Sequence, residues 1–348
     1  METLISSLNT QLAFAITHAS DIAAARRAGQ KLALELGFNE TRAGQLALIV
    51  TEAGTNLLKH AGEGTLYLNV AQSEGVPGVD VLAVDNGPGI ADLDACLRDG
   101  MSTAGTSGTG LGALRRLSDE FDVYSTPGNG ALFFMRLWRD EAPPPLCRVE
   151  VGALAVPLAG EDACGDGWGV ACDGAGATLL AVDGLGHGPE AATAAQSAIR
   201  ELAHRPSSEP GALVDAAHAA LRITRGAALA AARIDFAADV VRFAGVGNIG
   251  AYVIDGDTRR ALISHNGIVG HNMRKVQEFT VPCPPGAMCI LHSDGIQTQW
   301  DLDKYPGLLA RSPALVAAML MRDYIRRRDD AMVLVVRRRH GGQRGGQS

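Results

Sequence analysis

The sequence has few aromatic residues, few cysteines and no long uninterrupted apolar stretch. Aromatic residues make up 5% of the 348 residues, and the six cysteines show neither Cys-x-x-Cys pairing nor histidine partners at zinc spacing. No uncharged stretch approaches the ~20 apolar residues that a membrane helix needs, and residues 1–6 lack the basic start of a signal peptide. We therefore expect a soluble, cytoplasmic protein with reduced cysteines and no structural zinc.

An overall basic charge is also absent, because the formal net charge is -7. No nucleic-acid or membrane partner is expected from this balance. The two arginine runs, Arg326–Arg328 and Arg337–Arg339, flank a strand candidate and are interpreted as solvated strand ends.

The length and one proline-rich segment indicate two domains. A single core rarely grows past about 250–300 residues, and Pro143, Pro144 and Pro145 cannot continue a helix or a central strand. We expect a first domain at residues 1–139, a linker at 140–147, a second domain at 148–338 and a flexible tail at 339–348.

The first half alternates helical and strand patterns, which predicts an α+β sandwich with helices on one face of a sheet. The expected helices are residues 21–36, ended by Gly37, and residues 40–60. The expected strands are 65–71, 79–85, 121–125 and 131–137.

Four polar residues share one face of the second expected helix: Glu52, Asn56, Lys59 and His60. An Asn oxygen can ligate Mg²⁺, and a Glu one turn earlier can accept a proton from an attacking hydroxyl. A face that simply meets solvent would give the same pattern.

Two glycine-rich segments follow this helix. Asp85 ends an apolar strand and enters a turn with Gly87 and Gly89, where a carboxylate can accept a hydrogen bond from an adenine amino group. Gly108, Gly110 and Gly112 precede a helix whose first amides can hold phosphate. Alone, that second segment would also suit a flexible loop.

Together these motifs resemble the ATP-binding fold shared by gyrase, Hsp90-type chaperones and histidine kinases. Within it they are most similar to the bacterial serine/threonine switch kinases. Residues 99–103 and 116–121 support this resemblance. It implies that Glu52 is the catalytic base, that Asn56 ligates Mg²⁺, and that Asp85 contacts the adenine of ATP. It also implies that the glycines hold the nucleotide. Ala131 stands where this family often has threonine, which puts catalytic competence in question.

The second half is rich in strand patterns, and we expect two antiparallel sheets flanked by helices. The expected strands are residues 153–157, 169–172, 179–182, 228–234, 240–244, 251–254, 288–291 and 331–336. The expected helices are 188–204, 210–225 and 312–326.

Acidic residues lie where these apolar strands end or begin: Asp166, Asp183, Asp294, Asp329 and Asp330. Asp-Gly is ordinarily a turn dipeptide. If the turns converge, however, unpaired carboxylates would repel one another, and hard divalent cations would relieve the repulsion.

This ordered set resembles the metal-dependent protein phosphatases of type 2C, in particular their compact bacterial branch, and implies an αββα sandwich. By this resemblance, Asp183 bridges two Mn²⁺ or Mg²⁺ ions and the Gly184 carbonyl binds one. Asp166, Asp294 and Asp329 complete the coordination, with Asp330 adjacent. His187 either protonates the leaving oxygen or stabilises a turn.

The two resemblances imply a bifunctional regulator that uses ATP with Mg²⁺ in one domain and two metal ions in the other. Its implied substrates are serine or threonine residues of STAS-domain proteins, either a stressosome scaffold or an anti-sigma antagonist. The alternative is a phosphatase whose first domain binds a partner without catalysis, such as a sigma factor or another phosphatase.

Overall fold

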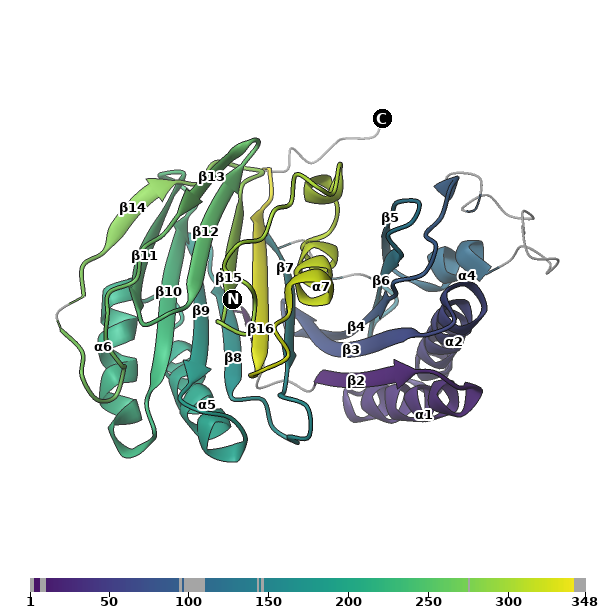
Figure 1. Ribbon diagram of the computed structural model, residues 1–348, viewed down its shortest axis with the longest axis horizontal. Coiled ribbons are helices and arrows are strands. Elements are labelled where there is room, and N and C mark those ends of the chain that lie inside the picture. Colours follow the sequence, from purple (N-terminus) through teal and green to yellow (C-terminus); the bar gives the residue numbers. More distant parts are fainter. Residues whose placement is uncertain are drawn as a thin grey trace. The chain divides into compact units, whose positions relative to one another are not determined.

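The computed structural model describes residues 3–6, 11–93, 96, 110–142, 144, 147–274 and 276–340 (Figure 1). The chain divides into two compact units. One contains residues 10–145 and 305–318, and the other contains residues 1–9, 146–304 and 319–348. None of the helices in the described ranges is both long and apolar enough to cross a membrane. We call these the ATPase-type unit and the acidic-site unit, after the motifs they carry.

The ATPase-type unit contains one antiparallel sheet with the strand order β2-β3-β4-β6-β5. Its strands are β2 (Gln11–Ile16), β3 (Gly64–Ser73), β4 (Val76–Val84), β5 (Glu120–Ser125) and β6 (Ala131–Trp138). Its helices are α1 (Ala19–Glu35), α2 (Glu40–Asn56) and α4 (Gly110–Leu117). The expected α+β sandwich is confirmed, and β2 is a strand that the sequence pattern did not indicate.

Apolar side chains spaced for a helix on α1 and α2 form this unit's core with the sheet. Ile22 and Leu32 of α1 and Ile49 of α2 are buried, and they belong to one cluster with Leu66 of β3 and Met135 of β6. Burial of such side chains stabilises each by about 1.5–3 kcal/mol. The helices therefore cover one face of the sheet and fix the direction in which α2 presents its polar residues.

The second expected helix does not continue as an α-helix to residue 60. It ends at Asn56, and Leu57–Ala61 forms a π-helical turn. Because a π turn bonds residue i to i+5, it adds one residue per turn and shifts everything after it. Lys59 and His60 are exposed while Glu52 and Asn56 are half-buried. The expectation that all four share one α-helical face is therefore wrong for Lys59 and His60.

The acidic-site unit contains two antiparallel sheets, with the strand orders β1-β8-β9-β10-β11-β14 and β13-β12-β15-β16-β7. The first sheet is made of β1 (Thr3–Ser6), β8 (Asp166–Cys172), β9 (Gly176–Gly184), β10 (Ala227–Asp235), β11 (Val240–Val246) and β14 (Phe279–Pro282). The second is made of β7 (Val149–Val156), β12 (Gly250–Asp255), β13 (Thr258–Ala261), β15 (Met288–His292) and β16 (Ala331–Arg338). Its helices include α5 (Pro189–His204) and α6 (Pro210–Ala220), and α7 spans Pro313–Tyr324.

Alternation along the central strands explains how the first sheet is buried on both faces. In β9, Leu179 and Ala181 belong to the core between the sheets, whereas Leu180 and Val182 belong to a second core that includes residues of α5 and α6. Successive side chains of a strand point to opposite faces. Figure 1 shows α5 and α6 together along the first sheet. The two predicted antiparallel sheets are confirmed. Because both faces of the central strands in the first sheet are buried, polar residues are found at the ends of these strands.

Candidate nucleotide and metal sites

Asp85 is fixed in place by the first residue of β6. Its backbone N–H donates to the Ala131 carbonyl at 3.1 Å, and its Oδ1 accepts from the Ala131 N–H at 3.1 Å. The same oxygen accepts from the Gly87 N–H at 2.8 Å. Only 7% of Asp85 is exposed. The carboxylate therefore has one orientation, set by backbone groups that do not depend on the side chain at position 131.

The turn after Asp85 lies directly against the hairpin between β5 and β6. The Gly130 N–H donates to the Gly87 carbonyl at 2.9 Å, and the Gly128 N–H donates to the Pro88 carbonyl at 2.8 Å. At Gly89, φ is +71°, and a Cβ would collide with the Thr126 carbonyl oxygen. Glycine is the residue that tolerates both conditions, so the backbone can turn here without a side chain in the way.

Glu52 and Asn56 lie one turn apart near the end of α2, as the sequence predicted. Within the described residues, the side chain of Glu52 makes no hydrogen bond or ion pair, and it is half-buried. The Nδ2 atom of Asn56 is buried without a partner in the described structure. A buried amide without a partner costs free energy comparable to a lost hydrogen bond. The end of α2 therefore presents one carboxylate and one amide that lack partners of their own.

The glycines of the second segment are only partly described. Gly110 begins α4, and Gly112 is buried within its first turn. Gly108 and the supporting residues 99–103 lie outside the described residues, so the structure does not bear on them. The first turn of α4 has backbone amides without helical partners, which is the property that suits an anion.

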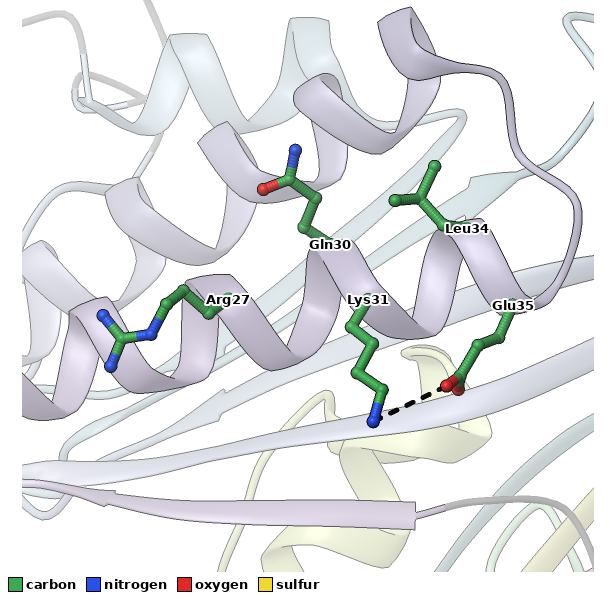
Figure 2. A pocket seen from close by; sticks show the side chains of 5 residues that line it. All are labelled: Arg27, Gln30, Lys31, Leu34 and Glu35. Carbon is green, nitrogen blue, oxygen red and sulfur yellow. Dashed lines mark ion pairs between the residues drawn. The ribbon is translucent and has the colours of Figure 1, made fainter.

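A shallow surface hollow lies elsewhere on this unit, along α1 (Figure 2). It is lined by Arg27, Gln30, Lys31, Leu34 and Glu35. All its lining side chains come from one helix, and Lys31 pairs with Glu35 at 3.7 Å. None of the predicted nucleotide-site residues lines it, so the hollow is separate from that site.

The acidic residues of the second unit converge from both of its sheets. Asp166 and Asp183 are cross-strand partners where β8 and β9 pair. Asp294 follows β15, and Asp330 precedes β16, its partner strand. The Gly165 N–H, next to Asp166, donates to Asp330 Oδ2 at 2.7 Å and so joins the two sets. The predicted carboxylates therefore do gather at one edge of the sandwich.

Mutual repulsion and burial shape the chemistry of this acidic cluster. Burial, followed by the charges of Asp294 and Asp329, raises the pKa of Asp183 to about 7. Burial and the Asp183 charge raise the pKa of Asp166 well above its usual range. Burial and Asp329 raise the pKa of Asp294, which the nearby Arg326 lowers again. The raised pKa values mean that burial and neighbouring negative charges destabilise the ionised carboxylates, and that nearby positive charge does not compensate for this.

Asp330 has a second role that its sequence position did not reveal. Its Oδ1 accepts from the Leu158 N–H at 2.7 Å, while its Oδ2 accepts from Gly165. Only 2% of this residue is exposed. Asp330 therefore clamps both ends of the loop at residues 158–165, whereas the neighbouring Asp329 is exposed and accepts from the Asp330 N–H at 2.9 Å.

The segment after Asp183 is held by close packing and by one acid-histidine pair. Gly184 is buried, and a Cβ there would collide with the Ala191 carbonyl at the start of α5. His187 Nδ1 lies 2.6 Å from Glu161 Oε1, within the loop that Asp330 clamps. This contact, which is made through Nδ1, fits the interpretation of His187 as a turn-stabilising residue.

The cluster is contacted by two polar residues, Asn248 and Ser293, which the sequence pattern did not single out as site residues. Asn248 Nδ2 donates to Asp294 Oδ2 at 2.7 Å. Ser293 accepts from the Met332 N–H at 2.9 Å through Oγ and hydrogen-bonds to Asp166, which lowers that residue's pKa. The sequence could have indicated these two residues only by their positions, since Asn248 follows a Gly-x-Gly turn and Ser293 is next to Asp294.

The donor set fits hard divalent cations on two observations. Asp166 Oδ2 is buried without a hydrogen-bond partner in the described structure, and the carboxylates raise one another's pKa values. Oxygen ligands with excess negative charge are what Mg²⁺ and Mn²⁺ prefer. Within the described ranges, no three His, Cys, Asp or Glu side chains are arranged to hold an ion as they stand.

Comparisons with known proteins match both units. The histidine kinase-like ATPase domain family matches residues 16–135, and the SpoIIE family, described as stage II sporulation protein E, matches residues 173–339. The serine/threonine-protein kinase RsbT of Bacillus subtilis (strain 168) is 36% identical over 123 residues, which are 35% of this chain and 92% of RsbT.

Two solved structures extend the comparison. One, described as "The bacterial stressosome: a modular system that has been adapted to control secondary messenger signaling", is 33% identical with a TM-score of 0.51. It covers 54% of this chain and 99% of that chain. RsbX in complex with magnesium is 19% identical with a TM-score of 0.49, and covers 54% of this chain and 94% of that chain. The chain thus belongs to the RsbT family of serine/threonine kinases through its ATPase-type domain, and carries a SpoIIE-family domain after it.

Proposed function

We propose that this chain is a bifunctional partner-switching regulator that both phosphorylates and dephosphorylates serine or threonine residues of STAS-domain proteins. Residues 1–139 would act as the kinase and residues 148–338 as the phosphatase, joined by the linker at 140–147. The structure divides the chain differently at two places, because strand β1 pairs with β8 and residues 305–318 group with the ATPase-type unit. The observation that carries the proposal is that an RsbT-like domain and a converging acidic cluster occur in one chain.

In the kinase domain, the proposed roles follow the arrangement around α2 and β4. Asp85, oriented by its backbone partners, would accept a hydrogen bond from adenine. Asn56 would contribute its amide oxygen to Mg²⁺. Its Nδ2 atom, buried without a partner in the described structure, would remain able to donate a hydrogen bond to a bound ligand. Glu52 would accept the proton of the attacking hydroxyl, since no described residue neutralises its carboxylate. Backbone segments at Gly87, Gly89, Gly108, Gly110 and Gly112 would surround the nucleotide.

In the phosphatase domain, Asp183 and Asp166 would hold ions from β9 and β8, with Asp294 and Asp329 on the opposite side. The Gly184 carbonyl completes the proposed set. Two Mn²⁺ or Mg²⁺ ions would supply the Lewis acidity that phosphate-ester hydrolysis requires. Asp330 is next to this set and would act mainly by holding the loop at 158–165 in place, because both its oxygens accept backbone hydrogen bonds.

The proposed partners are STAS-domain proteins, either a stressosome scaffold or an anti-sigma antagonist, and the proposed location is the cytoplasm. The similarity to RsbT and to a chain described with the bacterial stressosome supports this choice. Because both activities on one residue would only hydrolyse ATP, we propose that they act on different sites or in different partner-bound states.

The test is incubation of the full chain with labelled ATP and the STAS proteins encoded nearby, with and without Mn²⁺. We expect label to enter the STAS protein with ATP and Mg²⁺, and Mn²⁺ to promote its release. Glu52→Gln is the matched kinase control, and Asp183→Asn is the phosphatase control. Absence of transfer from the unmutated chain to every STAS protein, with release intact, would contradict the kinase half.

That outcome would favour the second candidate, a phosphatase whose first domain binds a partner without catalysis. The observation behind it is Ala131, which offers only its backbone groups to Asp85. A sigma factor or another phosphatase would then be the partner of the first domain. Retained ATP binding without transfer, together with complex formation in a pull-down, would distinguish this candidate from the bifunctional one.

A further inference from the structure

Three consecutive arginines stand immediately before the acidic cluster. Arg326, Arg327 and Arg328 are all exposed, and within the described structure none of them forms an ion pair or a side-chain hydrogen bond. Three adjacent cations repel one another, and Arg326 offsets part of this by its attraction to Asp294, whose pKa it lowers.

The two ends of this arginine turn are attached to the two sides of the acidic cluster. Before it, Ile325 forms a bridge with Ile296, and the Arg326 N–H donates to the Gly295 carbonyl at 2.8 Å. Gly295 directly follows Asp294. After it come Asp329 and Asp330, and Asp330 is clamped to the loop at 158–165. The turn is therefore held beside the aspartates rather than extending freely into solvent.

The backbone of the turn is also strained. Arg327 has a φ of +57°, a left-handed conformation that costs free energy for a residue with a Cβ. Such conformations persist where the surroundings impose them, and they are frequent at functional sites. Here the imposed conformation turns three arginine side chains outward within one short segment.

The other arginine run shows that this arrangement is not a general property of strand ends in this protein. Arg338 is 3% exposed and pairs with Asp239 at 2.5 Å, so the expectation that this second run is solvated is wrong for it. Arg337 and Arg339 both pair with Glu150 at 3.3 Å. The run at 337–339 thus fastens the fold, whereas the run at 326–328 leaves its charges available.

We propose that Arg326, Arg327 and Arg328 form a docking surface for acidic side chains that flank the phosphorylated serine or threonine of the substrate protein. This inference rests on the proposed phosphatase function and deepens it. The phosphoryl group itself would enter the aspartate cluster, so cations spread over an adjacent turn are placed to meet the residues on either side. They would also offset the repulsion between a cluster of carboxylates and an anionic substrate in a chain of net charge -7.

The test compares two synthetic phosphothreonine peptides of equal length with the full chain and Mn²⁺. In one peptide the flanking residues are Asp and Glu, and in the other they are Asn and Gln. We expect kcat/KM to be about tenfold higher for the acidic peptide at low salt, through a lower KM, and the difference to shrink as salt rises. In the triple variant Arg326→Gln, Arg327→Asn, Arg328→Gln, the ratio between the peptides should fall toward one. Asn is used at position 327 because it tolerates the left-handed conformation.

Two further variants separate charge from folding. Replacing all three arginines by lysine should keep most of the preference, because electrostatic docking requires charge more than guanidinium geometry. Arg200→Gln, at an exposed arginine of α5 without an ion pair in the described structure, should leave the ratio unchanged. An unchanged ratio in the triple Gln/Asn variant, or equal kcat/KM for both peptides in the unmutated chain, overturns the docking surface alone. If the unmutated chain hydrolyses neither peptide, the proposed phosphatase function fails and the docking surface fails with it.

Discussion

The two neighbouring aspartates before β16 should respond very differently to removal. Asp330 is buried and accepts backbone hydrogen bonds from Leu158 and Gly165, whereas Asp329 is exposed. Asp330→Ala leaves both of these N–H groups without their acceptor. We therefore expect Asp330→Ala to destabilise the acidic-site unit even in chelator, and Asp329→Ala to affect activity alone.

The magnitude follows from the bonds that are lost. A hydrogen bond to a charged acceptor contributes about 1.5–3 kcal/mol, so two give roughly 3–6 kcal/mol. Removing one carboxylate also relieves repulsion within the cluster, which offsets part of this loss, because the pKa of Asp330 is raised by burial and by Asp329. We expect a net decrease of about 2–4 kcal/mol in the free energy of unfolding, or roughly 4–16 °C in Tm for a unit of this size.

Differential scanning calorimetry of the full chain in chelator measures this effect, since the two units can give separate transitions. Asp329→Ala is the control, and its transition should move by less than about 0.5 kcal/mol, the usual range for a surface substitution. Hydrogen exchange at the amides of residues 158–165 should accelerate in Asp330→Ala only. A Tm within about 2 °C of the unmutated chain would refute the clamp, because two lost charged acceptors cannot cost so little.

The other predictions concern the two proposed active sites. Glu52→Gln should keep ATP binding and lose about 10²- to 10⁴-fold in transfer of labelled phosphate, as general-base removal typically does; unchanged transfer would exclude Glu52 as the base. Asp85→Asn should weaken ATP binding in calorimetry by roughly 1–3 kcal/mol, because the groups around this side chain donate hydrogen bonds and the new amide would present a second donor to the adenine amino group. Equal affinity of the unmutated chain for ATP and GTP would argue against adenine recognition. Asp183→Asn should reduce Mn²⁺-dependent hydrolysis of an aryl phosphate more than Asp294→Asn does, and full activity in chelator would contradict a metal mechanism. Because the pKa of Asp183 is raised to about 7, the folded state binds more protons than the unfolded state between about pH 4 and 7, so Tm in chelator should fall as pH rises through this window. Added Mn²⁺ should reverse that fall above pH 7, and a Tm that rises with pH would show the opposite linkage.

Central strands were predictable from the sequence, and so were the edge strands β5 and β7, but the edge strands β1, β2, β13 and β14 were not. Runs such as 179–182 and 228–234 are apolar because both faces of their strands are buried, so composition alone indicates them. Strands β13 and β14 have four residues each and are mostly exposed, so neither alternation nor apolarity marks them. The π turn at residues 57–61 was likewise hidden, because its residues would suit an α-helix equally well.

The acidic cluster was predictable as a set but not in its internal division of roles. Turn positions after apolar strands indicate that carboxylates meet at one edge. The pattern cannot show that Asp330 accepts two backbone hydrogen bonds, because its donors lie more than 160 residues away in the chain. Similarly, Asn248 reaches Asp294 only through the pairing of β12 with β15, and two arginine runs of equal length differ only in the acids that folding brings to them.

The pairing of β1 with β8 makes the acidic-site unit discontinuous along the chain, and this has a consequence during synthesis. Thr3–Ser6 pairs with Gly169–Cys172, so the first strand leaves the ribosome long before its partner exists. At about 5–20 residues per second, the delay is on the order of 10–30 s. During that time residues 10–145 of the ATPase-type unit are translated, whereas residues 305–318 of that unit follow only after β8. Until β8 is made, β1 would present unpaired backbone groups to any other nascent strand. The order of translation therefore sets the interval in which β1 has no partner of its own chain and is open to a strand of a neighbouring one.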